Sequence, residues 1–65
     1  MLEINGEKWQ LDKPHTIGSL LAELGQEPAR VVIEYNGAIP DREKWQDIHL
    51  QPGDRLEIVR FMGGG

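Results

Sequence analysis

The sequence has 65 residues, which is the size of one small domain. It carries 11 acidic against 7 basic side chains, and the resulting net charge of −4 argues against binding to nucleic acid or to an anionic membrane surface. The absence of cysteine excludes disulfides, thiol nucleophiles and thiolate metal ligands.

The length of the apolar runs and the size of the core further limit the class of protein. The longest apolar runs have three residues, too short for a membrane span, and Met1–Ile4 lacks the features of a signal peptide, so a cytoplasmic setting is expected. A domain of this length buries only about 60% of its unfolded surface. It has little room for a substrate pocket, so we expect a protein that is not an enzyme by itself.

The first predicted element is a β-hairpin over residues 2–11. Asn5 and Gly6 are the preferred pair for a type I′ turn, in which both residues take positive φ. The turn predicts three cross-strand pairs: Leu2 with Trp9, Glu3 with Lys8, and Ile4 with Glu7. One face of the hairpin is then apolar and comprises Leu2, Ile4, Trp9 and Leu11.

A helix is predicted after Pro14. Thr16 is a favourable N-cap, whereas Ser19 at the third helical position predicts an incomplete capping box. The apolar residues that follow have helical spacing: Ile17, Leu20, Leu21 and Leu24. Gly25 is predicted to end the helix at the C′ position.

The second half of the chain is predicted to contain three strands, at residues 30–35, 48–50 and 55–62. Between the first two, residues 40–47 are polar except for Trp45, and a helical turn or short 3₁₀ helix would bury this ring. The segment Gln51–Asp54 has the signature of a type II turn.

The order of predicted elements is β-β-α-β-β-β, so the fold class is α+β, with a mixed sheet of four to five strands packed against one helix. This order resembles the β-grasp fold of ubiquitin-like proteins. The resemblance implies that the first and last strands lie side by side and parallel at the sheet centre. We expect residues 1–62 to form this domain and residues 63–65 to form a flexible glycine tail.

Few side chains suggest catalysis. His15 and His49 have no carboxylate at ligand spacing, and we expect both at the surface. Ser19 has no partner base nearby in the sequence, and the acidic residues are scattered, as on a solvated face. No metal site and no bound cofactor are therefore predicted.

The last strand leads directly into Gly63, Gly64 and Gly65. Glycines cannot pack and are entropically costly to order, so a structural role is hard to assign; a cloning scar or a frayed end is the alternative. A tail without Cβ atoms can enter a narrow channel and present the Gly65 carboxylate to another protein's active site. Transfer to ATP would give an acyl-adenylate, which a sulfur nucleophile can convert to a thiocarboxylate.

Docking also needs a surface beside the tail. If Leu56 and Ile58 face the helix, Val59 and Phe61 face away, and with Val32 they are predicted to form an apolar partner-docking patch. The alternative is that the strand twists or bulges and Phe61 covers the sheet end. The acidic excess suggests basic partner surfaces and a salt-sensitive association.

Several segments match one known family: the strand with Asn5-Gly6, Thr16-Ile17-x-x-Leu20-Leu21, residues 31–37 with Ile39-Pro40, Trp45, Pro52-Gly53-Asp54 before Leu56-Glu57-Ile58, and the final Gly64-Gly65. Over its whole length the chain resembles the ThiS family, the sulfur carrier proteins of thiamine biosynthesis. Gly63 is a mild variation that adds reach.

The resemblance implies a set of partners. An E1-like adenylyltransferase would activate Gly65 with ATP and Mg²⁺, a cysteine-desulfurase-type donor would supply sulfur, and thiazole synthase would receive it to build the thiazole moiety of thiamine. The alternatives are a molybdopterin-synthase-type small subunit, a ubiquitin-like protein modifier, and a plain β-grasp interaction domain whose glycine end is accidental.

Overall fold

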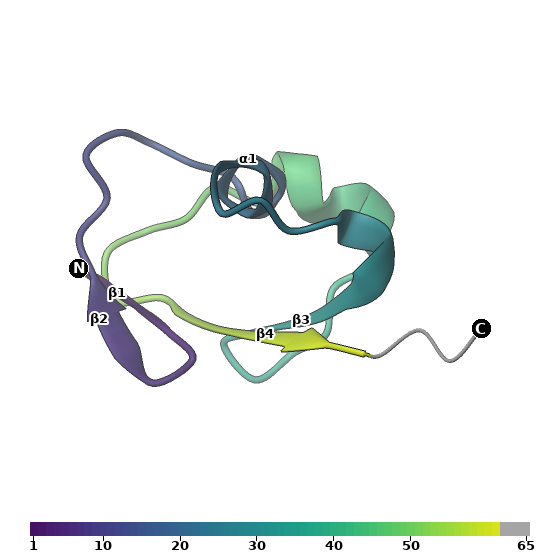
Figure 1. The fold of residues 1–65 in the computed structure, drawn as a ribbon. Helices are drawn as coiled ribbons and strands as arrows, with labels where there is room; N and C mark the ends of the chain where they lie inside the picture. Colours follow the sequence, from purple (N-terminus) through teal and green to yellow (C-terminus); the bar gives the residue numbers. More distant parts are fainter. Residues whose placement is uncertain (62–65) are drawn as a thin grey trace.

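The computed structural model describes residues 1–61 (Figure 1). Its elements are β1 (Leu2–Ile4), β2 (Glu7–Trp9), α1 (Ile17–Glu23), the 3₁₀ helix η1 (Pro28–Arg30), β3 (Val31–Tyr35), the 3₁₀ helix η2 (Arg42–Asp47) and β4 (Arg55–Arg60). Met62 and the three glycines lie outside the described residues, so the domain boundary and the glycine tail stay predictions. No helix within residues 1–61 is long and apolar enough to cross a membrane.

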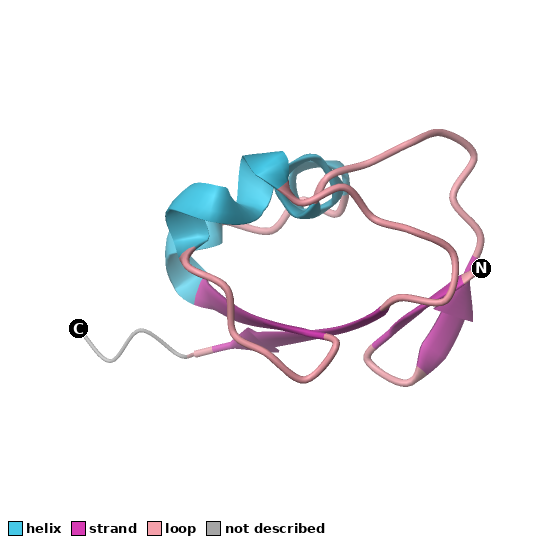
Figure 2. Cartoon of the chain, turned by 180° about the vertical axis from the view of Figure 1, so that it is seen from behind, coloured by secondary structure: helices cyan, strands magenta, loops and turns pink. Residues whose placement is uncertain are grey.

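The four strands form one mixed sheet in the order β2-β1-β4-β3. The central strands β1 and β4 are parallel, and the other two pairs are antiparallel. The helical elements gather on one face of this sheet, and the other face stays open (Figure 2). This is the predicted β-grasp arrangement, with four strands.

The predicted strand at residues 48–50 is wrong. His49 forms a single bridge with Thr16, the Ile17 N–H donates to the Ile48 carbonyl at 3.0 Å, and the Leu50 N–H donates to the His15 carbonyl at 2.9 Å. This segment therefore pairs with the chain that enters α1 and not with the sheet. The strand predicted at residues 30–35 begins one residue later, at Val31, because Pro28–Arg30 forms η1, and the strand predicted at residues 55–62 is β4, which ends at Arg60.

The hairpin has the predicted register, and Asn5 and Gly6 take φ values of 52° and 82°. The Asn5 side chain adds a link that sequence reasoning missed. Its Oδ1 accepts from the Ile58 N–H at 2.7 Å, and its Nδ2 donates to the Ile58 carbonyl at 3.4 Å. The turn is thereby tied to β4. Trp9, predicted on the apolar face, is 37% exposed because β2 is an edge strand.

The start of α1 corrects one prediction. The Ser19 N–H donates to Thr16 Oγ1 at 3.0 Å, and the Thr16 N–H donates to Ser19 Oγ at 2.8 Å, so the capping box is complete. A serine oxygen therefore does the work that Glu or Gln usually does at this position. Gly25 has a φ of 72°, as predicted for the residue that ends the helix.

The core lies between α1 and the sheet, and η2 closes one side of it. Its buried apolar residues are Leu2, Ile4, Ile17, Leu20, Leu21, Val31, Ile33, Trp45 and Leu56. The burial of Trp45 in a 3₁₀ helix confirms the prediction for residues 40–47; its Nε1 donates to the Pro40 carbonyl at 3.3 Å. Gly18 is also buried, and a Cβ there would collide with the Gln46 side chain.

Candidate functional site

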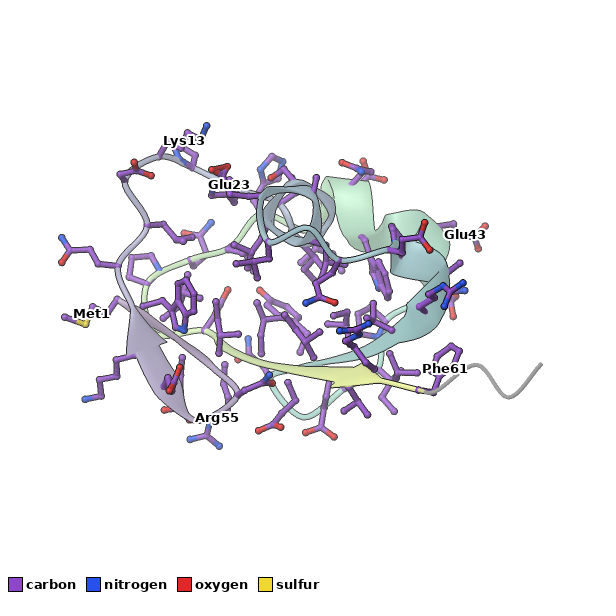
Figure 3. All side chains as sticks on the ribbon, viewed as in Figure 1. Met1, Lys13, Glu23, Glu43, Arg55 and Phe61 are labelled. Atoms are coloured by element: carbon purple, nitrogen blue, oxygen red, sulfur yellow. The ribbon has the colours of Figure 1, made fainter. Side chains whose placement is uncertain are left out.

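An apolar patch lies on the open face of the sheet, where β4 ends. Val32 of β3 is directly opposite Val59 of β4, and the pairing continues as the Phe61 N–H donates to the Arg30 carbonyl at 3.2 Å. Val32, Val59 and Phe61 are 37%, 54% and 45% exposed. Figure 3 shows Phe61 at the end of β4, where the described chain stops. Val32, Val59 and Phe61 are called the apolar patch from here on. The exposure of Phe61 places its ring at the surface.

The remainder of the open face is charged. Glu34 is directly opposite Glu57, and Glu3 is paired with Lys8. Arg55, at the start of β4, places its Nε 3.5 Å from Glu3 Oε2. Like charges that face each other across a sheet cost stability. The apolar character of this face is thus confined to the end of β4 from which the tail continues.

A polar hollow of about 280 Å³ lies beside the same end of β4. It is lined by Gly25, Gln26, Glu27, Arg30 and Arg60. Arg30 Nε is 3.0 Å from Glu27 Oε2, and both side chains are largely exposed. Sequence reasoning did not single out these arginines, because only the folded chain brings residues 30 and 60 together.

His15 was expected at the surface, and this prediction is wrong. Its side chain is buried, with Nδ1 2.9 Å from Ser19 Oγ and Nε2 3.8 Å from Glu23 Oε2. His49 is exposed, as expected. His15 therefore belongs to the helix cap. The available signal was its spacing to Ser19 and Glu23, which lie on the side of α1 that faces His15.

Asp54 is a further exception, because it is buried and not on a solvated face. Its Oδ2 accepts from the Gln51 N–H and from the Tyr35 hydroxyl, each at 2.8 Å, and its Oδ1 accepts from Asn36 Nδ2 at 3.2 Å. Burial by itself would raise the pKa of Asp54, but these hydrogen bonds outweigh it and lower the pKa below its ordinary value. The same bond to Asp54 raises the pKa of Tyr35.

The Asp54 cluster is structural in character. It joins the end of β3 to the start of β4, at the opposite end of β4 from Phe61. Within residues 1–61, no group of three or more histidine, aspartate or glutamate side chains is placed to hold a metal ion. The candidate features of the described part are the surfaces around the end of β4, and the predicted tail residues Gly63, Gly64 and Gly65 lie outside the described residues.

A mixed four-stranded sheet around one helix, with an exposed patch where the last strand ends, defines a ubiquitin-like protein of the β-grasp class. The model of the ThiS family matches residues 1–65. The chain belongs to the ThiS family.

Individual relatives agree with this assignment. The chain is 40% identical to the sulfur carrier protein ThiS of Bacillus subtilis over 67 residues, an alignment that covers 100% of both chains. It is 39% identical to a thiazole synthase of Paramagnetospirillum magneticum over 98% of its own length. The alignment covers only 20% of that relative, so the chain matches one part of a longer protein.

Solved structures show the same fold. The crystal structure of the thiamine biosynthesis protein ThiS from Geobacter metallireducens superposes with a TM-score of 0.83, at 31% identity. The superposition covers 98% of this chain and 97% of that chain. The solution structure of a thiamine biosynthesis protein from the same organism gives a TM-score of 0.77, also at 31% identity.

Proposed function

We propose that this protein is a cytoplasmic sulfur carrier of thiamine biosynthesis that acts as a protein substrate of other enzymes. The alignment with the Bacillus subtilis sulfur carrier over the full length of both chains is the observation that carries this proposal. The relative named thiazole synthase contains a segment similar to this chain, which supports thiazole synthase as the enzyme that receives the sulfur.

The proposed chemistry begins at the carboxylate of Gly65. A carboxylate is a poor electrophile because its charge repels nucleophiles and its oxygen is a poor leaving group. In the active site of an E1-like adenylyltransferase, a carboxylate oxygen attacks the α-phosphorus of ATP and pyrophosphate leaves. Mg²⁺ bound with the ATP neutralises the phosphate charge. The product is an acyl-adenylate, whose leaving group is AMP.

Sulfur then replaces AMP. A cysteine-desulfurase-type donor provides a persulfide, whose terminal sulfur attacks the carbonyl carbon, and AMP leaves with the electron pair of the C–O bond. A thiol reductant supplies the two electrons that cleave the S–S bond, which leaves a thiocarboxylate on Gly65. Thiazole synthase takes this sulfur, an oxygen from the sulfur acceptor or from water replaces it on the carbonyl carbon, and the carrier returns as a carboxylate.

The surface of the folded domain offers a separate docking site beside the proposed reactive tail. The apolar patch of Val32, Val59 and Phe61 would dock on the partner, and the exposed area there has no role in the core. Gly65 is four residues beyond Phe61. Four extended residues reach at most ~14 Å. Gly63 and Gly64 would pass through a channel too narrow for side chains.

Intact-mass spectrometry tests the proposal. The protein is incubated with ATP, Mg²⁺, a sulfur donor and an adenylating enzyme of this type, and we expect its mass to rise by the difference between one sulfur and one oxygen. The reaction without ATP and a chain without Gly64 and Gly65 are the controls, and neither should shift. An unchanged mass in the complete reaction contradicts the proposal, and isopeptide conjugates to lysines would instead indicate a protein modifier.

A further inference from the structure

The charges of this protein are unevenly distributed. The net charge is −4, but the hollow beside the end of β4 is lined by two arginines, Arg30 and Arg60, and by one acid, Glu27, so its local charge is +1. The charged part of the open sheet face, by contrast, carries the facing pair of Glu34 and Glu57. A positive site therefore lies where β4 continues into the tail of an acidic protein.

The fold does not account for the charge of Arg60. Within residues 1–61, the Arg60 guanidinium makes no hydrogen bond and no ion pair. Arg30 pairs with Glu27, but exposed ion pairs of this kind contribute little to stability. Arg42 is different, because its guanidinium donates to the carbonyls of Pro28 and Val31 and is thereby used by the structure.

The two arginines and the apolar patch lie on either side of the same strand end. Arg60 follows the alternation of Leu56 and Ile58 toward the helical face, whereas Val59 and Phe61 belong to the open face. A partner that binds the tail must approach this strand end, and it would meet apolar side chains on one face and a guanidinium on the other.

We propose that the hollow lined by Arg30 and Arg60 receives an acidic side chain of the enzyme that binds the tail. A guanidinium presents a planar fork of donors that matches a carboxylate, and Arg30 and Gln26 offer further donors in the same hollow. A net charge of −4 disfavours a polyanion such as RNA as the occupant, so a single carboxylate on a protein surface fits best. This inference rests on the proposed function, because it concerns the same partner, and it adds one acidic group to the basic partner surfaces that the acidic excess suggests.

Charge reversal with a matched control tests the site. Arg60→Glu and Arg30→Glu are compared with Arg55→Glu, which changes the net charge equally at the far end of the same strand. The measurement is the dissociation constant for the adenylating enzyme at low and at high salt. We expect Arg60→Glu to weaken binding by about tenfold at low salt, with a smaller effect at high salt, and Arg55→Glu to change it by less than about twofold.

A complementary change identifies the partner group. Each acidic residue near the entrance of the enzyme's adenylation pocket is replaced by lysine, and one replacement should restore the binding of Arg60→Glu while weakening that of the unchanged carrier. Equal effects of Arg60→Glu and Arg55→Glu would overturn the inference, as would a saturable site for inorganic phosphate that is lost in Arg60→Glu.

The two proposals fail in different ways. If the unchanged carrier acquires the mass of a thiocarboxylate but Arg60→Glu binds as Arg55→Glu does, the proposed function stands and only the carboxylate site is wrong. If no thiocarboxylate forms on the unchanged carrier, the proposed function fails first. Arg60→Gln removes the charge without reversing it and should weaken binding less than Arg60→Glu. The unfolding transition of each variant checks that the fold is retained.

Discussion

At the scale of single residues, a few polar side chains tie the turns of this small protein to its strands. The Asp54 carboxylate accepts three hydrogen bonds, from Gln51, Tyr35 and Asn36. The Asn36 Oδ1 accepts in turn from the Arg55 N–H at 2.8 Å. A buried carboxylate is costly unless its hydrogen bonds are made, so this cluster is sensitive to any change that removes a partner.

Asp54 should contribute to the pH dependence of stability. Its pKa in the folded protein lies below the ordinary value of 3.8, so its contribution is complete above that pH and is lost as the pH falls through the folded pKa. We expect the free energy of unfolding of the unchanged protein to fall more steeply from about pH 6 to about pH 3 than that of Asp54→Asn. Urea unfolding at both pH values measures the difference.

The same substitution should also reduce stability at neutral pH. Asp54→Asn should lower the free energy of unfolding by about 1–3 kcal/mol there, because an amide cannot accept from all three donors. Tyr35→Phe is the matched control: it removes one donor, leaves the ring in place, and should retain part of the pH dependence. Parallel pH profiles for the unchanged protein and Asp54→Asn would show that Asp54 is not the titrating group.

At the scale of elements, the hairpin is joined to β4 in two ways. The backbone of β1 pairs with β4 in parallel, and the Asn5 side chain bonds both the N–H and the carbonyl of Ile58. The Asn5 N–H donates to the Leu56 carbonyl at 2.9 Å, and the Asn5 side chain extends this pairing to Ile58, although the backbone turns here with a φ of 52°. The structure therefore places two demands on the residue at position 5: a left-handed backbone conformation and an amide side chain.

Two substitutions separate these demands. Asn5→Gly keeps the left-handed backbone but loses the amide, and it should lower the free energy of unfolding by about 1 kcal/mol. Asn5→Ala loses both, and backbone strain should bring its cost to about 2–3 kcal/mol. Thermal or chemical unfolding of the two variants is the measurement. Equal costs for glycine and alanine would mean that only one of the two demands matters.

At the scale of the whole molecule, the two faces of the sheet differ in what covers them. One face packs against α1 and η2 and supplies the stability, whereas the open face carries the apolar patch beside the last strand's end (Figures 1 and 2). Because the patch is outside the core, we expect that it can change without loss of the fold. This separation lets docking and stability be measured independently.

Phe61→Asp tests the docking role of the patch. We expect the free energy of unfolding to change by no more than about 0.5 kcal/mol, because the ring is at the surface. The carrier concentration needed for half-maximal pyrophosphate release by the adenylating enzyme should rise by about tenfold. Gln10→Asp adds the same charge at an exposed position away from the patch and should leave that concentration unchanged. An unfolded Phe61→Asp variant would instead place the ring in the core.

The tail can be tested without touching the domain. A single alanine appended after Gly65 should leave the unfolding transition unchanged, because the core lies wholly within residues 2–56. It should abolish thiocarboxylate formation, since the reactive carboxylate would be displaced and a Cβ introduced next to the proposed channel. Intact mass after the complete reaction is the measurement. Full modification of the extended chain would contradict the assignment of Gly65.

The predictable part of this protein is local. The type I′ turn at Asn5-Gly6, the N-cap at Thr16 and the closing Gly25 depend on backbone angles that neighbouring residues impose, so they could be predicted before the fold was known. The exposed side of β4 was also predictable, because alternation along a strand assigns Val59 and Phe61 to one face once the core face is chosen.

The sequence by itself determined the hairpin turn and the start and end of the helix, since these follow from short stretches of chain. Only the tertiary structure decided which polar groups are buried and which charges meet. His15 and Asp54 lose their water because segments distant in the sequence cover them, and Arg30 joins Arg60 only when β3 pairs with β4. Burial and electrostatic contacts depend on which distant segments meet in the folded chain, whereas turns and helix ends depend on residues that are adjacent in the sequence.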